Sequence, residues 1–156
     1  MKKVNSQDAV TGEILPYALV AVKQKIPNGF MEGWVAMGLG SPMRALAGLR
    51  KELGADGYAV LFALLERLNF ENAIHVVQKE IAEELGMLQP NVSRSIKKLL
   101  ELGVLLEGPK FGRNRTYKLN PAYGWRGSAK SHQKALRAQE KASLAGLKIH
   151  KGGKAD

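Results

Sequence analysis

The sequence predicts a mainly α-helical protein with a small β component, an α+β class, and three observations support it. Apolar residues recur at helical spacing through most of residues 41–103, which is typical of amphipathic helices. Two short runs, 104–107 and 115–119, have strand character and flank a loop that contains Pro109 and Gly112. The chain has 156 residues and is 45% hydrophobic, which suits one core with appended segments.

Residues 1–29 are predicted to form an N-terminal β-hairpin or arm. Gly12 provides a turn within 8–13, and the strand-like run 14–22 follows, with Pro16 restricting it to a sheet edge. Residues 30–127 are the predicted main domain, which begins with helices. A short helix is expected around 30–38, a second with Ser41 as its N-cap and Pro42 at its first position, and a third from 58 to about 69 after a break at 54–57.

Two consecutive helices in residues 78–103 form the most informative part of the chain. The first is predicted to turn Ile81, Ala82 and Leu85 inward and to stop at Gly86. The second has an inward apolar stripe of Val92, Ile96, Leu99 and Leu100. Ala82 is small enough to let the two helices cross closely. This pattern favours a helix-turn-helix over an ordinary amphipathic helix with a solvated basic face.

Polar side chains lie largely off that apolar stripe, and their types suit the reading of DNA. Gln and Asn pair bidentately with adenine, and Arg pairs with guanine, whereas lysines further along a recognition helix suit phosphates. The predicted contacts of this helix are Gln89, Asn91, Ser93, Arg94, Lys97 and Lys98.

The two strand-like runs directly after this helix complete a winged helix-turn-helix. The loop between them is the wing, and Lys110, Arg113 and Arg115 lie in it or at its edge, where they can reach phosphates or a minor groove. Phe111 is expected to tuck under the wing rather than to stack on a sugar or a base.

The net charge of +10 is confined to the last third of the chain. Residues 1–107 carry 12 Lys/Arg and 12 Asp/Glu, whereas residues 108–156 carry 12 Lys/Arg against two acids. Such a field suits a polyanion, although a solvated tail or a membrane surface would account for the charge as well. Residues 128–156 are predicted to be a basic C-terminal tail, either disordered or helical with Ser131 as the cap. Its weaker DNA contacts, counted from the end of the main domain, are Arg126, Lys130, Lys134 and Arg137.

Residues from about 30 to 127 resemble the RepL-type plasmid replication proteins of bacteria. The matching pieces are 11–13, 78–86, 92–99 and, most distinctive, the ending 117–127 with its Leu-Asn-Pro element followed by an aromatic residue and a glycine. Asn120 and Pro121 are expected to end the wing strand, and Tyr123 and Trp125 to fold back on the core. The sequence departs from these proteins at Val77 and Leu88, where they often carry a Ser or Thr cap. The resemblance implies binding at a plasmid origin or control region, with host replication proteins as partners.

Three functions compete for this sequence. The first is a sequence-specific double-stranded DNA-binding protein that initiates plasmid replication or controls copy number, and the alternative is a winged-helix transcriptional regulator, a repressor. An enzyme that nicks DNA is disfavoured, because the three histidines are far apart in the sequence and Glu80, Glu83 and Glu84 suit a solvated face better than a metal site. No catalytic residue, metal or cofactor is predicted.

Partners and location follow from the same observations. A homodimer is expected, because two-fold proteins commonly match palindromic sites. The chain has no cysteine and no apolar run that suits a signal peptide or a membrane span, so the expected location is the cytoplasm, at the nucleoid or plasmid, with no membrane partner.

Overall fold

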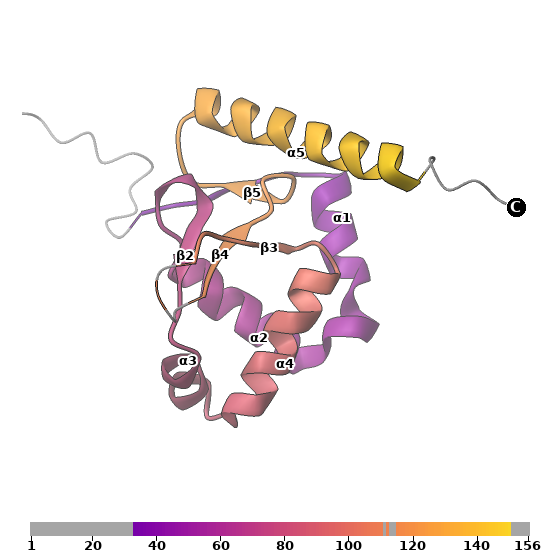
Figure 1. The fold of residues 1–156 in the computed structure, drawn as a ribbon. Coiled ribbons are helices and arrows are strands. Elements are labelled where there is room, and N and C mark those ends of the chain that lie inside the picture. The colour runs from indigo at the N-terminus through magenta and orange to yellow at the C-terminus, as the bar shows by residue number, and fades with distance from the viewer. Residues whose placement is uncertain (1–32, 111, 113–114, 151–156) are drawn as a thin grey trace, which may run out of the picture. The chain divides into compact units, whose positions relative to one another are not determined.

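The computed structural model describes residues 33–110, 112 and 115–150, and the predicted arm 1–29 lies outside them. Val35–Asp156 forms one compact unit. Figure 1 shows its elements, which are β1 (Ala36–Met37), α1 (Ser41–Gly48), α2 (Arg50–Glu66), the 3-10 turn η2 (Phe70–Asn72), β2 (Ala73–His75), α3 (Gln78–Leu85), α4 (Gln89–Glu101), β3 (Leu105–Glu107), β4 (Thr116–Leu119), β5 (Gly124–Trp125) and α5 (Ala129–His150). This is the predicted class, a mainly helical winged helix-turn-helix with a small sheet. No helix of the described ranges has the length and apolar character that crossing a membrane requires.

The core lies where α2, α3 and α4 pack on the sheet. Helix α4 buries one side along the stripe that its spacing predicts, and Ala82 on α3 is buried at the contact between the two helices. Burial of such apolar surface is the main favourable term in folding. The most completely buried apolar side chains are Val60, Leu64, Leu68, Ile74, Ile81, Val92, Ile96, Leu99, Val104, Leu105 and Leu119.

The three-stranded sheet has the order β2-β4-β3, and both pairings are antiparallel. Ile74 on β2 faces Tyr117 on β4, and Leu105 on β3 faces Leu119 on β4. The hairpin β3–β4 is the predicted wing, and it follows α4 directly. A separate two-stranded ribbon pairs β1 with β5, with Ala36 opposite Trp125.

Residues 120–127 pack back on the domain, as the sequence predicts for Tyr123 and Trp125. The Asn120 side chain donates to the Gly103 carbonyl (2.7 Å) and accepts a hydrogen bond from the Ala122 amide (2.9 Å), which ends β4 in a turn. Trp125 is buried at 7% exposure, and Tyr123 packs against the core. A glycine is needed at position 127, next to the Trp125 ring, because the Cβ of any other residue there would lie 2.6 Å from Trp125 Nε1.

Three local predictions need correction. The described part of the predicted 30–38 helix contains strand β1, because Met37 and Ala36 pair with β5 and the Gly38 amide donates to the Tyr123 carbonyl (2.9 Å). The cap of α1 is Gly40, with no side-chain bond, and Ser41 is already helical. The predicted break at 54–57 is confined to Gly54 (φ 63°), and the helix continues from there to Glu66 rather than to about 69.

The basic tail is helical where it is described, but α5 begins three residues before the predicted start at His132. Ser128 rather than Ser131 caps it, since Ser128 Oγ accepts the Ser131 amide (3.1 Å). Two contacts hold its first turns against the closing segment. The His132 ring stacks on Trp125 with centroids 5.2 Å apart, and His132 Nε2 lies 2.8 Å from the Pro121 carbonyl.

Candidate nucleic-acid interface

A tight turn sets the angle between α3 and α4. Gly86 adopts the left-handed conformation (φ 62°) that ends α3, which favours glycine because it has no Cβ, and the Met87 amide donates to the Ala82 carbonyl (2.8 Å). Helix α4 then begins at Gln89 with Pro90 in its first turn, where a missing amide hydrogen costs nothing. The prediction of a helix stopped by Gly86 and restarted before Pro90 is confirmed.

The exposed side of α4 brings the sequence-predicted polar residues together at its beginning. Gln89, Ser93 and Arg94 are exposed and Asn91 is half-buried. Arg94 Nη1 lies 3.5 Å from Asn91 Oδ1, so these two side chains share one surface. Ser95 is buried with Val92 and Ile96, which widens the inward side beyond the predicted stripe.

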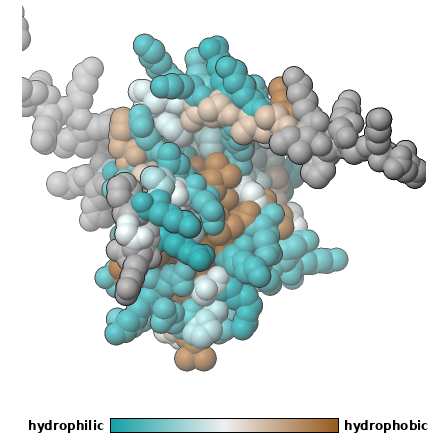
Figure 2. All heavy atoms as spheres, in the orientation of Figure 1, coloured by the Kyte–Doolittle hydropathy of each residue, from teal (hydrophilic) through white to brown (hydrophobic). Residues whose placement is uncertain are grey.

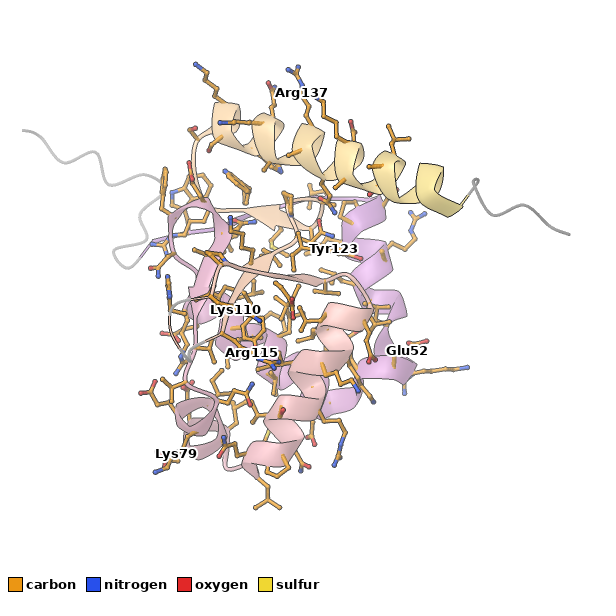
Figure 3. All side chains as sticks on the ribbon, viewed as in Figure 1. Glu52, Lys79, Lys110, Arg115, Tyr123 and Arg137 are labelled. Atoms are coloured by element: carbon orange, nitrogen blue, oxygen red, sulfur yellow. The ribbon has the colours of Figure 1, made fainter. Side chains whose placement is uncertain are left out.

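The two lysines of α4 have different surroundings. Lys97 is exposed and pairs with Glu101 one turn later at 3.8 Å, a solvated contact that contributes little and leaves the lysine available. Lys98 is also exposed, but its ammonium donates to the Glu52 carbonyl in the first turn of α2 (2.9 Å). Glu52, whose carbonyl accepts this hydrogen bond, is labelled in Figure 3.

The wing presents two cations in its described part. Lys110 and Arg115 are exposed and line one small hollow at the base of the loop (Figure 3). The loop is joined to β4 by the Gly108 amide, which donates to the Thr116 carbonyl (2.8 Å), and by the Thr116 hydroxyl, which donates to the Pro109 carbonyl. Arg113 and Phe111 lie outside the described residues.

The acidic side chains of α3, Glu80, Glu83 and Glu84, are exposed, as the sequence predicts, and two of them also form ion pairs. Glu84 pairs with Arg67 at 2.5 Å and Glu83 with Lys79 at 3.7 Å. Across the described ranges, no group of three His, Cys, Asp or Glu side chains is arranged to hold a metal ion.

The residues predicted as tail contacts divide into two groups. Arg126 is half-buried and belongs to the domain itself, because its guanidinium donates to the Leu68 carbonyl and its amide donates to Asn72 Oδ1 (2.8 Å). Lys130, Lys134 and Arg137 are exposed on α5, and Lys141 continues their row.

Leu88, which the sequence indicates only as a poor helix cap, is an exposed apolar side chain directly before α4. Its side chain is 72% exposed and makes no cap bond. Figure 2 shows an isolated hydrophobic group at the lower end of the molecule, where the turn between α3 and α4 lies. No signal in the sequence marks this leucine as exposed, because its surroundings are set by the angle between α3 and α4.

Comparisons with known proteins point to the same segment. The family model described as bacterial regulatory protein, arsR family, matches residues 78–105, which span α3, α4 and the start of β3. No curated protein matches the chain.

The chain also has a distant similarity to solved structures of proteins from bacteria and archaea. One is a possible transcriptional regulator from Methanosarcina mazei Go1 (18% identity, 72% of this chain and 89% of that chain, TM-score 0.38). Another is the transcriptional repressor BigR from Xylella fastidiosa (19%, 72% and 92%, TM-score 0.36), and a third is ZitR from Lactococcus lactis (17%, 73% and 78%, TM-score 0.34). The helix-turn-helix, residues 78–105, is thus the part of this chain that matches a family of bacterial regulatory proteins.

Proposed function

We propose that this chain is a sequence-specific double-stranded DNA-binding protein that acts as a transcriptional regulator. The observation that carries the proposal is the surface at the start of α4, where Gln89, Asn91 and Arg94 lie together directly after the turn from α3. Side chains at this position of a recognition helix reach base edges in the major groove. The family match over residues 78–105 supports the same reading.

The side chains have distinct roles in this proposal. Gln89 and Asn91 suit adenine and Arg94 suits guanine, while Ser93 is able to bond to either kind of base. Leu88 is placed to contact a thymine methyl group, the apolar feature of the major groove. Phosphates are contacted by Lys97 and Lys98 from α4 and by Lys110, Arg113 and Arg115 from the wing.

Initiation of plasmid replication remains the second candidate, and its support is the resemblance of residues 117–127 to RepL-type proteins. In the structure Asn120, Tyr123 and Trp125 close the domain. Folding therefore accounts for these residues, and they do not favour replication over regulation. The exposed surface of α4 serves either role equally well, so the location of the bound site decides between them.

A binding experiment tests the DNA-reading assignment first. Selection from a random duplex library yields the preferred sequence, and the dissociation constants of wild type and Arg94→Ala are then measured on that duplex and on a scrambled one. We expect the substitution to cost about 1–3 kcal/mol on the selected duplex only, and to relax the preference at one or two base pairs. Arg44→Ala removes an exposed arginine of α1 and is the matched control. Equal losses on both duplexes would remove the assignment.

A second measurement separates regulation from replication. A promoter reporter carrying the selected site, and a plasmid carrying the same site beside its origin, are each tested with the intact protein and with Arg94→Ala. Regulation predicts reporter activity that changes with the intact protein only, at constant plasmid copy number. Plasmid replication that requires the protein, with an indifferent promoter, would establish the replication candidate instead. We also expect a palindromic site bound by two copies of the chain.

A further inference from the structure

A row of four cations runs along one side of α5. Lys130, Lys134, Arg137 and Lys141 follow one another at three- and four-residue spacing, which places them on one face of a helix. All four are exposed, and within the described ranges none of them makes a salt bridge. The only acid that shares their groove, of about 810 Å³, is Glu71 near the start of the helix. The row of four cations therefore exceeds the nearby acids, which are Glu71 in the groove and Glu140 on the adjoining side of α5.

This row lies at the other end of the unit from the start of α4. Figure 1 shows α5 crossing the upper end, whereas the turn between α3 and α4 is at the lower end, with the sheet and α2 between them. Figure 3 shows Arg137 pointing away from the rest of the unit, and Figure 2 shows hydrophilic side chains along the same upper edge. We therefore expect a straight duplex seated on the start of α4 to leave the outer side of α5 free.

The first turns of α5 are held in place, so the direction of its cationic side is defined. Ser128 caps the helix, and His132 is fixed by its stack on Trp125 and by the Pro121 carbonyl. The anchoring side and the cationic side are different sides of the helix, since His132 is half-buried whereas Lys130 and Lys134 are exposed.

The dimensions of the row suit a phosphate backbone. Eleven residues separate Lys130 from Lys141, which corresponds to about 16 Å along a helix, enough to follow several consecutive phosphates of one strand at about 3.4 Å of axial rise each. Three of the four cations are lysines, which bind phosphate as point charges and read no sequence. A membrane surface fits less well, because amphipathic membrane helices carry Trp, Phe or Leu along a wide apolar face, and the described apolar side of α5 offers only Leu136 and Leu144.

We propose that the outer side of α5 is a second, sequence-independent DNA-binding surface, which holds a second duplex while α4 reads its own site. The protein then bridges two DNA segments. The inference rests on the proposed function for the first duplex, and α5 adds the second. It gives a role to the part of the charge excess that lies beyond the wing.

A capture experiment tests the bridge. A 30-base-pair duplex with the selected sequence is immobilised and saturated with the full chain, and a fluorescent duplex of unrelated sequence is then added. The variant Lys134→Gln/Arg137→Gln/Lys141→Gln lowers the net charge from +10 to +7. We expect it to lose capture of the second duplex at least tenfold, while its affinity for the immobilised duplex stays within twofold. The logarithmic salt slope of capture should fall by about 2 to 3, because each phosphate contact contributes about 0.9.

The control variant Arg44→Gln/Arg50→Gln/Lys51→Gln removes the same charge from exposed positions of α1 and α2 and should capture the second duplex like wild type. Equal loss in both variants would reduce the effect to net charge and overturn the proposal. A loss of affinity for the immobilised duplex as large as the loss of capture would show that α5 contacts the same duplex, which also overturns it. Capture of vesicles of phosphatidylcholine and phosphatidylserine in place of the second duplex would assign the surface to membranes.

The same experiment keeps the two proposals apart. If the wild type binds the immobilised duplex specifically but captures no second duplex, the bridge fails and the proposed function stands. If Arg94→Ala binds the immobilised duplex like wild type, the assignment of α4 fails whatever α5 captures.

Discussion

Asn72 connects its own segment to residues 119–126, which lie 47 to 54 positions later in the chain. Its side-chain amide donates to the carbonyls of Leu119 (3.0 Å) and Gly124 (2.7 Å), and its Oδ1 accepts the Arg126 amide (2.8 Å). The residue is 1% exposed and has φ of 61°, a left-handed conformation that asparagine tolerates better than most residues. One side chain thereby satisfies three buried backbone groups and at the same time fits a strained position.

Asn72→Ala is expected to lower the free energy of unfolding by about 3 kcal/mol. The substitution leaves three buried polar groups without partners, each at about 1–3 kcal/mol where water does not replace the contact, and alanine disfavours the positive φ. Urea denaturation measures the change. Asn69→Ala, at an exposed position nearby, should stay within about 0.5 kcal/mol of wild type. A similar, small effect for both variants would mean that Asn72 does not hold these segments together.

Leu88 stands at the N-cap of α4 in an extended conformation, and its side chain supplies no hydrogen bond to the first turn. Leu88→Ser is expected to raise the free energy of unfolding by about 1 kcal/mol, because a serine oxygen at this position accepts an orphan amide of the helix. Leu88→Ala removes the same leucine without adding an acceptor, and the difference between the two melting temperatures isolates the cap. A serine variant no more stable than the alanine variant would show that the first turn of α4 already has other partners.

The elements that the sequence predicts well are those whose pattern is local. The signals that predict α3, α4 and the wing all lie within a few neighbouring residues: a helical spacing of apolar residues, a glycine that ends a helix, or a turn between two strands. The strands of the wing and the apolar stripe of α4 are therefore predictable from the sequence. Strand β1 is different, because its two residues are paired with β5, about 88 positions later in the chain. No local propensity predicts such a pair. The local pattern of residues 30–38 therefore predicts a short helix where the structure has strand β1.

Side chains inside the domain were the harder part of the site to predict. The positions of Arg94, Lys97 and the wing cations follow from helical spacing and loop position. Arg126 was counted with the tail contacts because it is basic and follows the wing, but its guanidinium bonds to the Leu68 carbonyl, 58 residues earlier. Ser95 and Asn72 are polar by type and buried in fact. Their partners are backbone groups or neighbours that a sequence pattern does not show.

Helix α5 is held to the closing segment mainly at its start, so its cap controls a large part of its order. Ser128→Ala is expected to remove about 1 kcal/mol of local helix stability, because Ser128 Oγ then no longer accepts the Ser131 amide. Hydrogen exchange should become faster in the first turns of α5 and stay unchanged in α4. Ser143→Ala, at an exposed serine in the interior of the same helix, should leave exchange at the start of α5 unchanged. Uniform protection in both variants would place the anchoring of α5 elsewhere.

The two functional surfaces that we propose have opposite characters. At the start of α4, polar groups with directional bonding gather around Arg94, and the ion pair of Lys97 with Glu101 lies further along the helix. Along the cationic row of α5, by contrast, positive charge exceeds negative charge and directional groups are few. Specific reading requires the first kind of surface, and sequence-independent attraction requires only the second. Because the two surfaces lie at opposite ends of one small unit, one copy of the chain has room to hold two DNA duplexes at once.

The domain is closed by contacts between its middle and its end, so its cooperative folding should depend on residues beyond the winged helix itself. Asn120 bonds to Gly103, Gly124 and Arg126 bond to Asn72, and β5 pairs with β1. A chain that ends at Leu119 contains α1 to β4, but the Asn72 side chain keeps only Leu119 of its three partners and β1 loses β5. We expect it to lack a sharp thermal transition by circular dichroism, because buried polar groups without partners destabilise the compact state.

A chain that ends at Gly127 keeps all of these contacts and loses only α5. It should melt cooperatively, but at a lower temperature than the full chain, because Trp125 no longer has His132 stacked on it. If the chain that ends at Leu119 melted cooperatively at the same temperature as the chain that ends at Gly127, the winged helix would fold without residues 120–127, and these residues would not contribute to its stability.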